Sequence, residues 1–279
     1  MCARHNIFQY FFTMMEHYPL PLRVITREVS SNWTGALHGH FSNEGPNDIV
    51  AARNQHQSVL DEFTNRSIPV EVLAADTDSP DCVFVEDHGV IVGNRALATR
   101  VGAPSRRAES QPVHAALSEK VEIVHMKESG TLDGGDVLVL PKRVIVGRSR
   151  RTNDEGIKQL EKFVLEAGRS FHVVDVPSFS LHLISICTSP APGHLIVSEG
   201  WPDSTFDDFG FHLHRLPFAQ SYGANVLPLG EDILVAEGFP AASEVIENLG
   251  LHPIPVNMEE IRRADGSLTC LSLRFYESD

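Results

Sequence analysis

The sequence predicts an α/β protein in which one small unit, made of two strands, a helix and a further strand, recurs about five times. Three observations predict it: β-rich hairpins at similar intervals, a helix after most hairpins, and a short strand after each helix. Repeats of this length are typical of radial or stacked architectures, and a closed ring would remove sheet edges and surround a central channel. The alternative is an α/β domain whose hairpins fall at similar intervals by chance.

The predicted hairpins share a β-rich run, a turn rich in Gly, Pro or charge, and a second β-rich run. They begin at Cys82, Asp136, His182 and Asn225, so their starts lie 54, 46 and 43 residues apart. Another β-rich run, "SLTCLSLRF", begins 42 residues later at Ser267 and is predicted to start a fifth unit. The first copy is predicted to begin near "LRVITREV", residues 22–29.

Helices are predicted between the hairpins. In "GIKQLEKFVLEAG", residues 156–168, apolar residues recur at helical spacing and Gly168 ends the pattern. "PAASEVIENLG", residues 240–250, opens with proline and closes with glycine, as helices often do. Helices are also predicted over 47–63 and 104–120. The strands that follow the helices are predicted at residues 68–73, 121–126, 171–176 and 252–256.

Composition limits the partners and the location. The net charge of −14, from 23 basic and 37 acidic residues, argues against a nucleic-acid partner. No apolar run is long enough for a transmembrane helix. The four cysteines, at positions 2, 82, 187 and 270, match neither a zinc finger nor a disulfide framework, which favours free thiols and a cytoplasmic location. Residues 1–21 are predicted to form an N-terminal extension and residues 22–279 a single domain.

Reactive side chains occupy similar places in the units. Asp81, Glu86 and Asp87 surround one β-rich run, while the other positions precede or begin runs elsewhere: Asp133, Asp136, His182 and Cys270. Equivalent positions in a ring face one axis, so carboxylates, an imidazole and a thiol are predicted to converge. Each residue also has a purely structural interpretation: a buried cysteine, a core histidine, or an aspartate in a glycine turn.

Six motifs, taken in order, resemble those of the dimethylarginine dimethylaminohydrolase family: "SPDCVFVED", "GAPSRR", "TLDGGDV", "SRRTN", "LHL" and "DGSLTC". The resemblance extends from about Leu22 to Phe275, with a divergent segment over 200–222. It implies the pentein fold, a five-bladed α/β propeller with a pseudo-fivefold repeat of ββαβ units around a central channel. It also implies hydrolysis of asymmetric dimethylarginine or monomethylarginine to citrulline and an alkylamine through a covalent cysteine adduct.

The resemblance assigns a role to each candidate residue. Cys270 matches the nucleophile, His182 the general acid and base, and Asp133 the carboxylate that orients the histidine. Leu37 matches a lid residue, and the residue before Asp265, whose carbonyl faces the substrate amine, is Ala264. The other predicted substrate contacts are of two kinds. Three acids match the acidic cluster around the substrate: Asp81, Glu86 and Asp87. Two arginines, Arg106 and Arg151, match those that hold the substrate carboxylate.

The chemistry agrees with these roles. A guanidinium is a poor electrophile, so attack on its carbon requires a strong nucleophile such as a thiolate. Carboxylates can hold the cation in plane through charge-assisted hydrogen bonds. The leaving amine requires a proton, which a histidine can supply before it takes one from the attacking water.

Several alternatives remain at this point. Arginine deiminase performs the same chemistry on unmethylated arginine, but its members usually carry a helical insertion for which this chain is too short. An amidinotransferase, and a non-catalytic pentein-fold binding protein such as the translation initiation factor of this fold, are the others; the motif of papain-like proteases is absent. No cofactor is expected, and zinc held by Cys270 and His182 would inhibit. The expected ligand is a small guanidino amino acid, and the protein is expected to be a monomer or homodimer.

Overall fold

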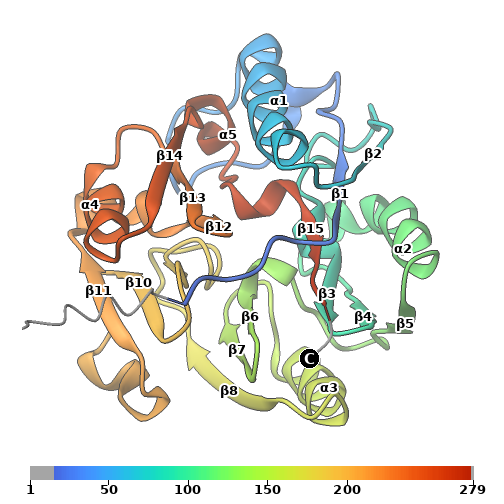
Figure 1. Cartoon of the computed structure of the whole chain (residues 1–279). Coiled ribbons are helices and arrows are strands. Elements are labelled where there is room, and N and C mark those ends of the chain that lie inside the picture. The colour runs from blue at the N-terminus through green and yellow to red at the C-terminus, as the bar shows by residue number, and fades with distance from the viewer. Residues whose placement is uncertain (1–15, 278–279) are drawn as a thin grey trace, which may run out of the picture.

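The computed structural model describes residues 16–277, which form five three-stranded sheets arranged around a common centre (Figure 1). In each sheet the middle strand pairs antiparallel with the inner strand and parallel with the outer strand. This arrangement confirms the predicted fold class and the repeated unit.

Four of the sheets are continuous in sequence. They are β3 (Gly89–Val92), β4 (Arg95–Ala98) and β5 (Glu122–His125); β6 (Val137–Leu140), β7 (Arg143–Arg148) and β8 (Ser170–Asp175); β9 (Cys187–Thr188), β10 (His194–Ser198) and β11 (His212–Leu216); and β12 (Leu227–Leu229), β13 (Asp232–Ala236) and β14 (His252–Val256).

The fifth sheet closes the ring with strands from both ends of the described chain. Strand β15 (Leu273–Phe275) pairs antiparallel with β1 (Arg23–Arg27), and β1 pairs parallel with β2 (Val70–Leu73). The run at Ser267 and the copy near Leu22, predicted as the starts of two units, therefore belong to one blade. Closure hides the edges that β1 and β15 would otherwise expose.

Helices make the parallel crossovers between middle and outer strands. These helices are α1 (Ile49–Asn65), α2 (Ser110–Ser118), α3 (Asp154–Glu166) and α4 (Pro240–Asn248). The Asp48 side chain caps α1 by accepting from the backbone N–H groups of Val50 and Ala51 at 2.9 and 3.0 Å. A 3₁₀ helix, η5 (Asp203–Phe209), makes the crossover in the β9–β11 sheet, where the sequence is divergent. A short helix, α5 (Glu259–Arg263), follows β14.

Buried apolar side chains join neighbouring sheets to one another and to the helices. In one such cluster Val90 and Leu97 of one sheet pack with Val144 of the next and with Leu160 and Phe163 of α3. Burial of this kind supplies the main favourable term in folding. The inner strands therefore have fixed positions around the centre of the ring.

The prediction that residues 82–87 form a strand is wrong. Phe84 N–H donates to the Asp81 carbonyl at 3.0 Å, and residues Val85–His88 form the 3₁₀ helix η2. Short 3₁₀ helices also stand before β6, at η4 (Gly134–Asp136), and before β15, at η7 (Thr269–Leu271). The apolar residues of 82–87 are all buried, rather than buried on alternate sides as in a half-exposed strand, and those of 83–85 divide between two apolar clusters.

Residues 1–15 of the predicted N-terminal extension lie outside the described residues, while residues 16–21 pack on the ring. The hydroxyl of Tyr18 lies 2.7 Å from Ser189 Oγ, and its ring packs against a buried apolar cluster. Burial raises the pKa of Tyr18 to about 12. No helix in the described part of the chain has the length and hydrophobicity of a membrane span.

Candidate active site

Cys270 lies in η7, in the short segment between α5 and β15. Its side chain is buried and only 8% exposed. The Asn225 side chain fixes the residue beside it, because its Oδ1 accepts from Thr269 N–H at 3.2 Å while its Nδ2 lies 2.9 Å from Thr269 Oγ1. Burial, with a contribution from the carboxylates of Glu86 and Asp87, raises the pKa of the thiol. The thiol is therefore protonated at neutral pH when no cation lies beside it.

A buried ion pair supports the Cys270 segment. Arg274 Nη1 donates to the carbonyls of Thr269 and Ser272, both at 2.8 Å, and Arg274 Nη2 donates to Glu86 Oε1 at 2.5 Å. The other Glu86 oxygen accepts from Thr269 Oγ1 at 2.7 Å. Both oxygens of Glu86 are thus engaged by the protein, and its predicted contact with substrate stays a prediction. The resemblance did not single out Arg274, which lies 188 residues from Glu86 in sequence.

His182 and Asp133 come together as predicted. His182 Nε2 lies 3.0 Å from Asp133 Oδ2, and Asp133 Oδ1 accepts from Gly102 N–H at 2.7 Å. Burial alone would lower the pKa of His182, but the carboxylates of Asp87, Asp136 and Asp133 outweigh it and raise the pKa to about 9. The imidazole is therefore positively charged at neutral pH and ready to donate a proton.

The two glycines of "TLDGGDV" allow this close packing. A Cβ atom on Gly135 would lie 2.7 Å from His182 Nδ1 and 3.0 Å from Asp87 Oδ1, and one on Gly134 would overlap the carbonyl oxygen of Glu86. The imidazole and the 3₁₀ helix η2 thus occupy the space that side chains would take. Glycine is required here by close approach and not by a left-handed backbone.

The Asp136 carboxylate makes hydrogen bonds that join two segments of the chain. Its Oδ1 accepts from Leu183 N–H at 3.0 Å, and its Oδ2 accepts from the hydroxyls of Ser149 and Thr152, both at 2.6 Å. Burial raises the pKa of Asp136 to about 6. Because it ties the residue after His182 to the turn that carries Arg151, its arrangement fits the structural interpretation of an aspartate beside glycine.

Asp87 and Arg106 form a buried network. Asp87 Oδ1 accepts from Gly135 N–H at 3.1 Å and Oδ2 from Arg106 Nη1 at 2.5 Å. Arg106 also donates to Glu109 Oε2 at 3.0 Å and to the Phe84 carbonyl at 3.2 Å. The positive charges of His182 and Arg106 outweigh burial and hold the pKa of Asp87 below its usual value. Each nitrogen of Arg106 already has a protein partner, and its predicted contact with the substrate carboxylate stays a prediction.

Arg151 differs from Arg106 in one respect. Its Nη1 is buried and has no hydrogen-bond partner among the described residues. Its backbone is fixed by a bond from Arg151 N–H to Ser149 Oγ at 3.0 Å. An unpaired buried guanidinium donor costs about 1–3 kcal/mol or more, so the position favours an added anionic acceptor.

Two acids hold the segment that carries Leu37. Asp81 accepts from Leu37 N–H at 3.1 Å, and Asp265 accepts from the N–H groups of His40 and Phe41 at 2.9 and 2.8 Å. Burial raises the pKa of Asp81 to about 6. The Leu37 side chain, at the first of these attachments, is 39% exposed, while Ala264, beside Asp265, is buried. The segment 37–41 is therefore anchored at both ends, and the predicted lid role of Leu37 stays a prediction.

Three buried groups have ligand atoms within 4.8 Å of one another: Asp87, Asp133 and His182. Hydrogen bonds from Arg106, Gly135 and Gly102 already satisfy the two carboxylates. Cys270 does not belong to this group, and the predicted inhibitory zinc at Cys270 and His182 stays a prediction.

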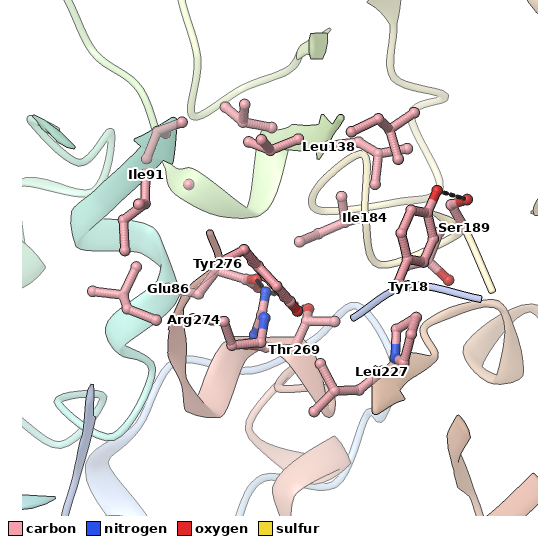
Figure 2. A pocket seen from close by; sticks show the side chains of 18 of the residues that line it. Tyr18, Glu86, Ile91, Leu138, Ile184, Ser189, Leu227, Thr269, Arg274 and Tyr276 are labelled. Atoms are coloured by element: carbon pink, nitrogen blue, oxygen red, sulfur yellow. Dashed lines mark hydrogen bonds and ion pairs between the residues drawn. The ribbon is translucent and has the colours of Figure 1, made fainter. Parts of the chain in front are cut away.

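A cavity of about 250 Å³ lies among the inner strands of the ring (Figure 2). Glu86, Thr269 and Arg274 line it on one side, and Tyr18 lines it on another. Cys270 and His182 are not among its lining residues. The cavity is therefore separate from the candidate catalytic groups, although Thr269, the neighbour of Cys270, borders it.

Comparison with known proteins places the chain in a family. The family model described as N,N dimethylarginine dimethylhydrolase, eukaryotic, matches residues 35–186. The N(G),N(G)-dimethylarginine dimethylaminohydrolase of Pseudomonas aeruginosa is 31% identical over 239 residues, covering 84% of this chain and 92% of that protein. The protein of the same name from Streptomyces coelicolor is 40% identical over 213 residues, covering 75% and 79%.

Solved structures agree with the sequence matches. The Pseudomonas aeruginosa enzyme, as a serine-for-cysteine mutant complexed with citrulline, superposes with a TM-score of 0.85 at 27% identity, covering 92% of this chain and all of that one. An amidinotransferase from Microseira wollei shares the fold with a TM-score of 0.76 at 15% identity, covering 95% and 97%. With the extent of the family match and the identity to the two hydrolases, these findings show that the chain belongs to the dimethylarginine dimethylaminohydrolase family.

Proposed function

We propose that this protein hydrolyses N-methylated arginine to citrulline and an alkylamine, with Cys270 as nucleophile and His182 as general acid and base. The observation that carries the proposal is a buried thiol and a cationic imidazole that both interact with the Asp87 carboxylate, with the imidazole held by Asp133 at 3.0 Å. Membership in a family of dimethylarginine hydrolases gives the substrate class.

The first half of the reaction forms a covalent adduct. The bound guanidinium lowers the free energy of the thiolate, which counters the burial that otherwise keeps Cys270 protonated. The thiol proton passes to solvent, and the sulfur attacks the guanidinium carbon, so that a C–S bond forms as the C=N π electrons move onto nitrogen. His182 then donates its proton to the substituted nitrogen, the C–N bond breaks and the amine leaves.

The second half releases citrulline. His182, now neutral, takes a proton from water, and the oxygen attacks the carbon of the adduct. The C–S bond breaks, the thiolate leaves, and the remaining hydroxyl proton passes to solvent as the neutral ureido group forms. Asp133 stays ionised throughout, and its role is to orient the imidazole and to stabilise its charged form.

The methylation pattern of the substrate should matter. Asymmetric dimethylarginine keeps two N–H donors on the unmethylated terminal nitrogen, while symmetric dimethylarginine loses one on each terminal nitrogen. A buried acceptor left without a donor costs about 1–3 kcal/mol, or roughly 5- to 150-fold in kcat/KM. Steady-state kinetics on the two isomers and on monomethylarginine should show turnover of the monomethyl and asymmetric forms and very little of the symmetric form. Equal rates for both dimethyl isomers would contradict this part of the proposal.

Arg151→Ala should raise KM and leave kcat nearly unchanged, because a contact with the distal carboxylate acts equally in the ground and transition states. Loss of a charge-assisted bond to the unpaired Arg151 Nη1 predicts a rise of roughly 10- to 100-fold. Arg151→Lys keeps the charge without the planar fork and should fall between the two. A fall in kcat with KM unchanged would assign Arg151 to the chemical step instead.

Unlike Arg151→Ala, Arg106→Ala should lower the stability of the folded protein around the candidate active site. Its removal leaves Asp87 and Glu109 buried without their cation, and breaking such a pair typically costs about 3–5 kcal/mol of stability. A lowered melting temperature would distinguish Arg106→Ala from Arg151→Ala.

The predicted cytoplasmic location, supported by the buried free thiols Cys82 and Cys187, and the choice between monomer and homodimer stay predictions.

A further inference from the structure

Three histidines meet on the sheet that lacks an α-helical crossover. His212 and His214 occupy alternate positions of β11, so their side chains leave the strand on the same side. In the parallel pairing of β10 with β11, His194 lies opposite His212. Strand β11 is the outer strand of its sheet, at the rim of the ring and away from the centre (Figure 1). The arrangement is therefore independent of the candidate active site.

The His194 imidazole contacts the other two rings. The His194 ring stacks with that of His212 at 5.1 Å between centroids and with that of His214 at 5.3 Å, at interplanar angles of 27° and 22°. His194 Nδ1 lies 3.0 Å from His214 Nε2. His212 is exposed, and the other two are half-buried, so a solute can reach all three from solvent.

The facing nitrogens of His194 and His214 are spaced as two ligands of one metal ion would be. Two nitrogens on one tetrahedral Zn²⁺, with bonds of about 2.0–2.1 Å, stand about 3.3 Å apart, which is close to the His194–His214 separation. Histidine rings are mostly neutral near pH 7, which is the form that binds a metal ion.

We propose that His194, His212 and His214 form a site for a divalent transition-metal ion of the zinc class, on the outer sheet and separate from Cys270. The ring that donates in the His194–His214 hydrogen bond moves its proton to its other nitrogen, so that both facing nitrogens offer lone pairs. The exposed His212 turns about its side-chain dihedrals to supply the third nitrogen. Solvent completes the coordination.

The ion would join β10 to β11 across the one sheet whose crossover is a 3₁₀ helix. Because binding favours the folded state by mass action, the site would stabilise that sheet. Imidazole nitrogen is a good ligand for Zn²⁺, Cu²⁺ and Ni²⁺ and a poor one for Mg²⁺ and Ca²⁺, so selectivity should follow that division.

Calorimetric titration of the chelator-stripped full chain with Zn²⁺ tests the proposal. The Cys270→Ser variant serves as the background, since it removes the thiol at which zinc is also predicted to bind. We expect a dissociation constant of about 10 µM or tighter, a rise in melting temperature with Zn²⁺ and none with Mg²⁺. His194→Gln and His214→Gln, each on that background, should weaken binding by at least about tenfold.

The matched control is His252→Gln, an exposed histidine on the outer strand β14 of another sheet, which should leave Zn²⁺ binding unchanged. The single substitutions His194→Gln and His214→Gln in the otherwise unmodified chain should retain turnover, which shows that they fold. Affinity in the millimolar range, or affinity that both substitutions leave unchanged, would overturn the proposal.

Discussion

Replacing Cys270 with serine is expected to abolish turnover while the fold remains. A serine hydroxyl is far less ionised than a thiol and far less nucleophilic toward a resonance-stabilised cation. Loss of the nucleophile in a covalent mechanism removes nearly the whole catalytic advantage of the reacting groups, so we expect kcat to fall by about 10⁴-fold or more. Steady-state release of citrulline measures it, and circular dichroism checks the fold.

The matched control is Cys187→Ser. Cys187 is also buried and free, but it lies in β9 and burial alone raises its pKa. This variant should keep turnover apart from any loss of stability. Substantial activity in Cys270→Ser, or labelling of Cys187 in place of Cys270 by a substrate-like electrophile, would remove Cys270 from the mechanism.

His182→Gln is expected to lower kcat by about 10²- to 10⁴-fold, because one side chain supplies the proton for the amine and accepts the proton from water. In the unmodified protein, kcat/KM should fall as pH rises above about 9, where His182 loses its proton.

Asp133→Asn provides the graded comparison. The imidazole remains, but its 3.0 Å partner no longer carries a charge, so orientation and the raised pKa are both weakened. The loss should be smaller than in His182→Gln, and the fall of kcat/KM should move to lower pH. Near-normal turnover in His182→Gln would mean that another group transfers the protons.

The ring could be predicted because its pattern is local. Hairpins such as β6–β7 and helices such as α3 are each specified by neighbouring residues, and their intervals reveal the repeat. Ring closure could not be deduced from these patterns, since the pairing of Arg23 with Phe275 joins opposite ends of the chain. The 3₁₀ helix η2 was also missed, because a short continuous run of apolar residues cannot distinguish a strand from a coil that is buried on every side.

Some residues of the candidate site could be predicted from the sequence, and others could not. His182 and Asp133 could be anticipated from the resemblance, and the structure places them in contact. The Glu86–Arg274 pair was missed, because Arg274 lies in an ordinary-looking strand and becomes meaningful only beside a carboxylate from another blade. The histidines of β10 and β11 were missed for the same reason, since only the sheet register brings His194 to His212.

The most direct test of the central claim is the identity of the products. The purified protein is incubated separately with asymmetric dimethylarginine and with arginine, and dimethylamine, ammonia and citrulline are quantified. Hydrolysis of methylated arginine through Cys270 predicts dimethylamine and citrulline in equal amounts from the first substrate, little ammonia from the second, and neither product with Cys270→Ser. Faster release of ammonia from arginine than of dimethylamine from dimethylarginine would contradict the proposed specificity and assign the protein to deiminase chemistry.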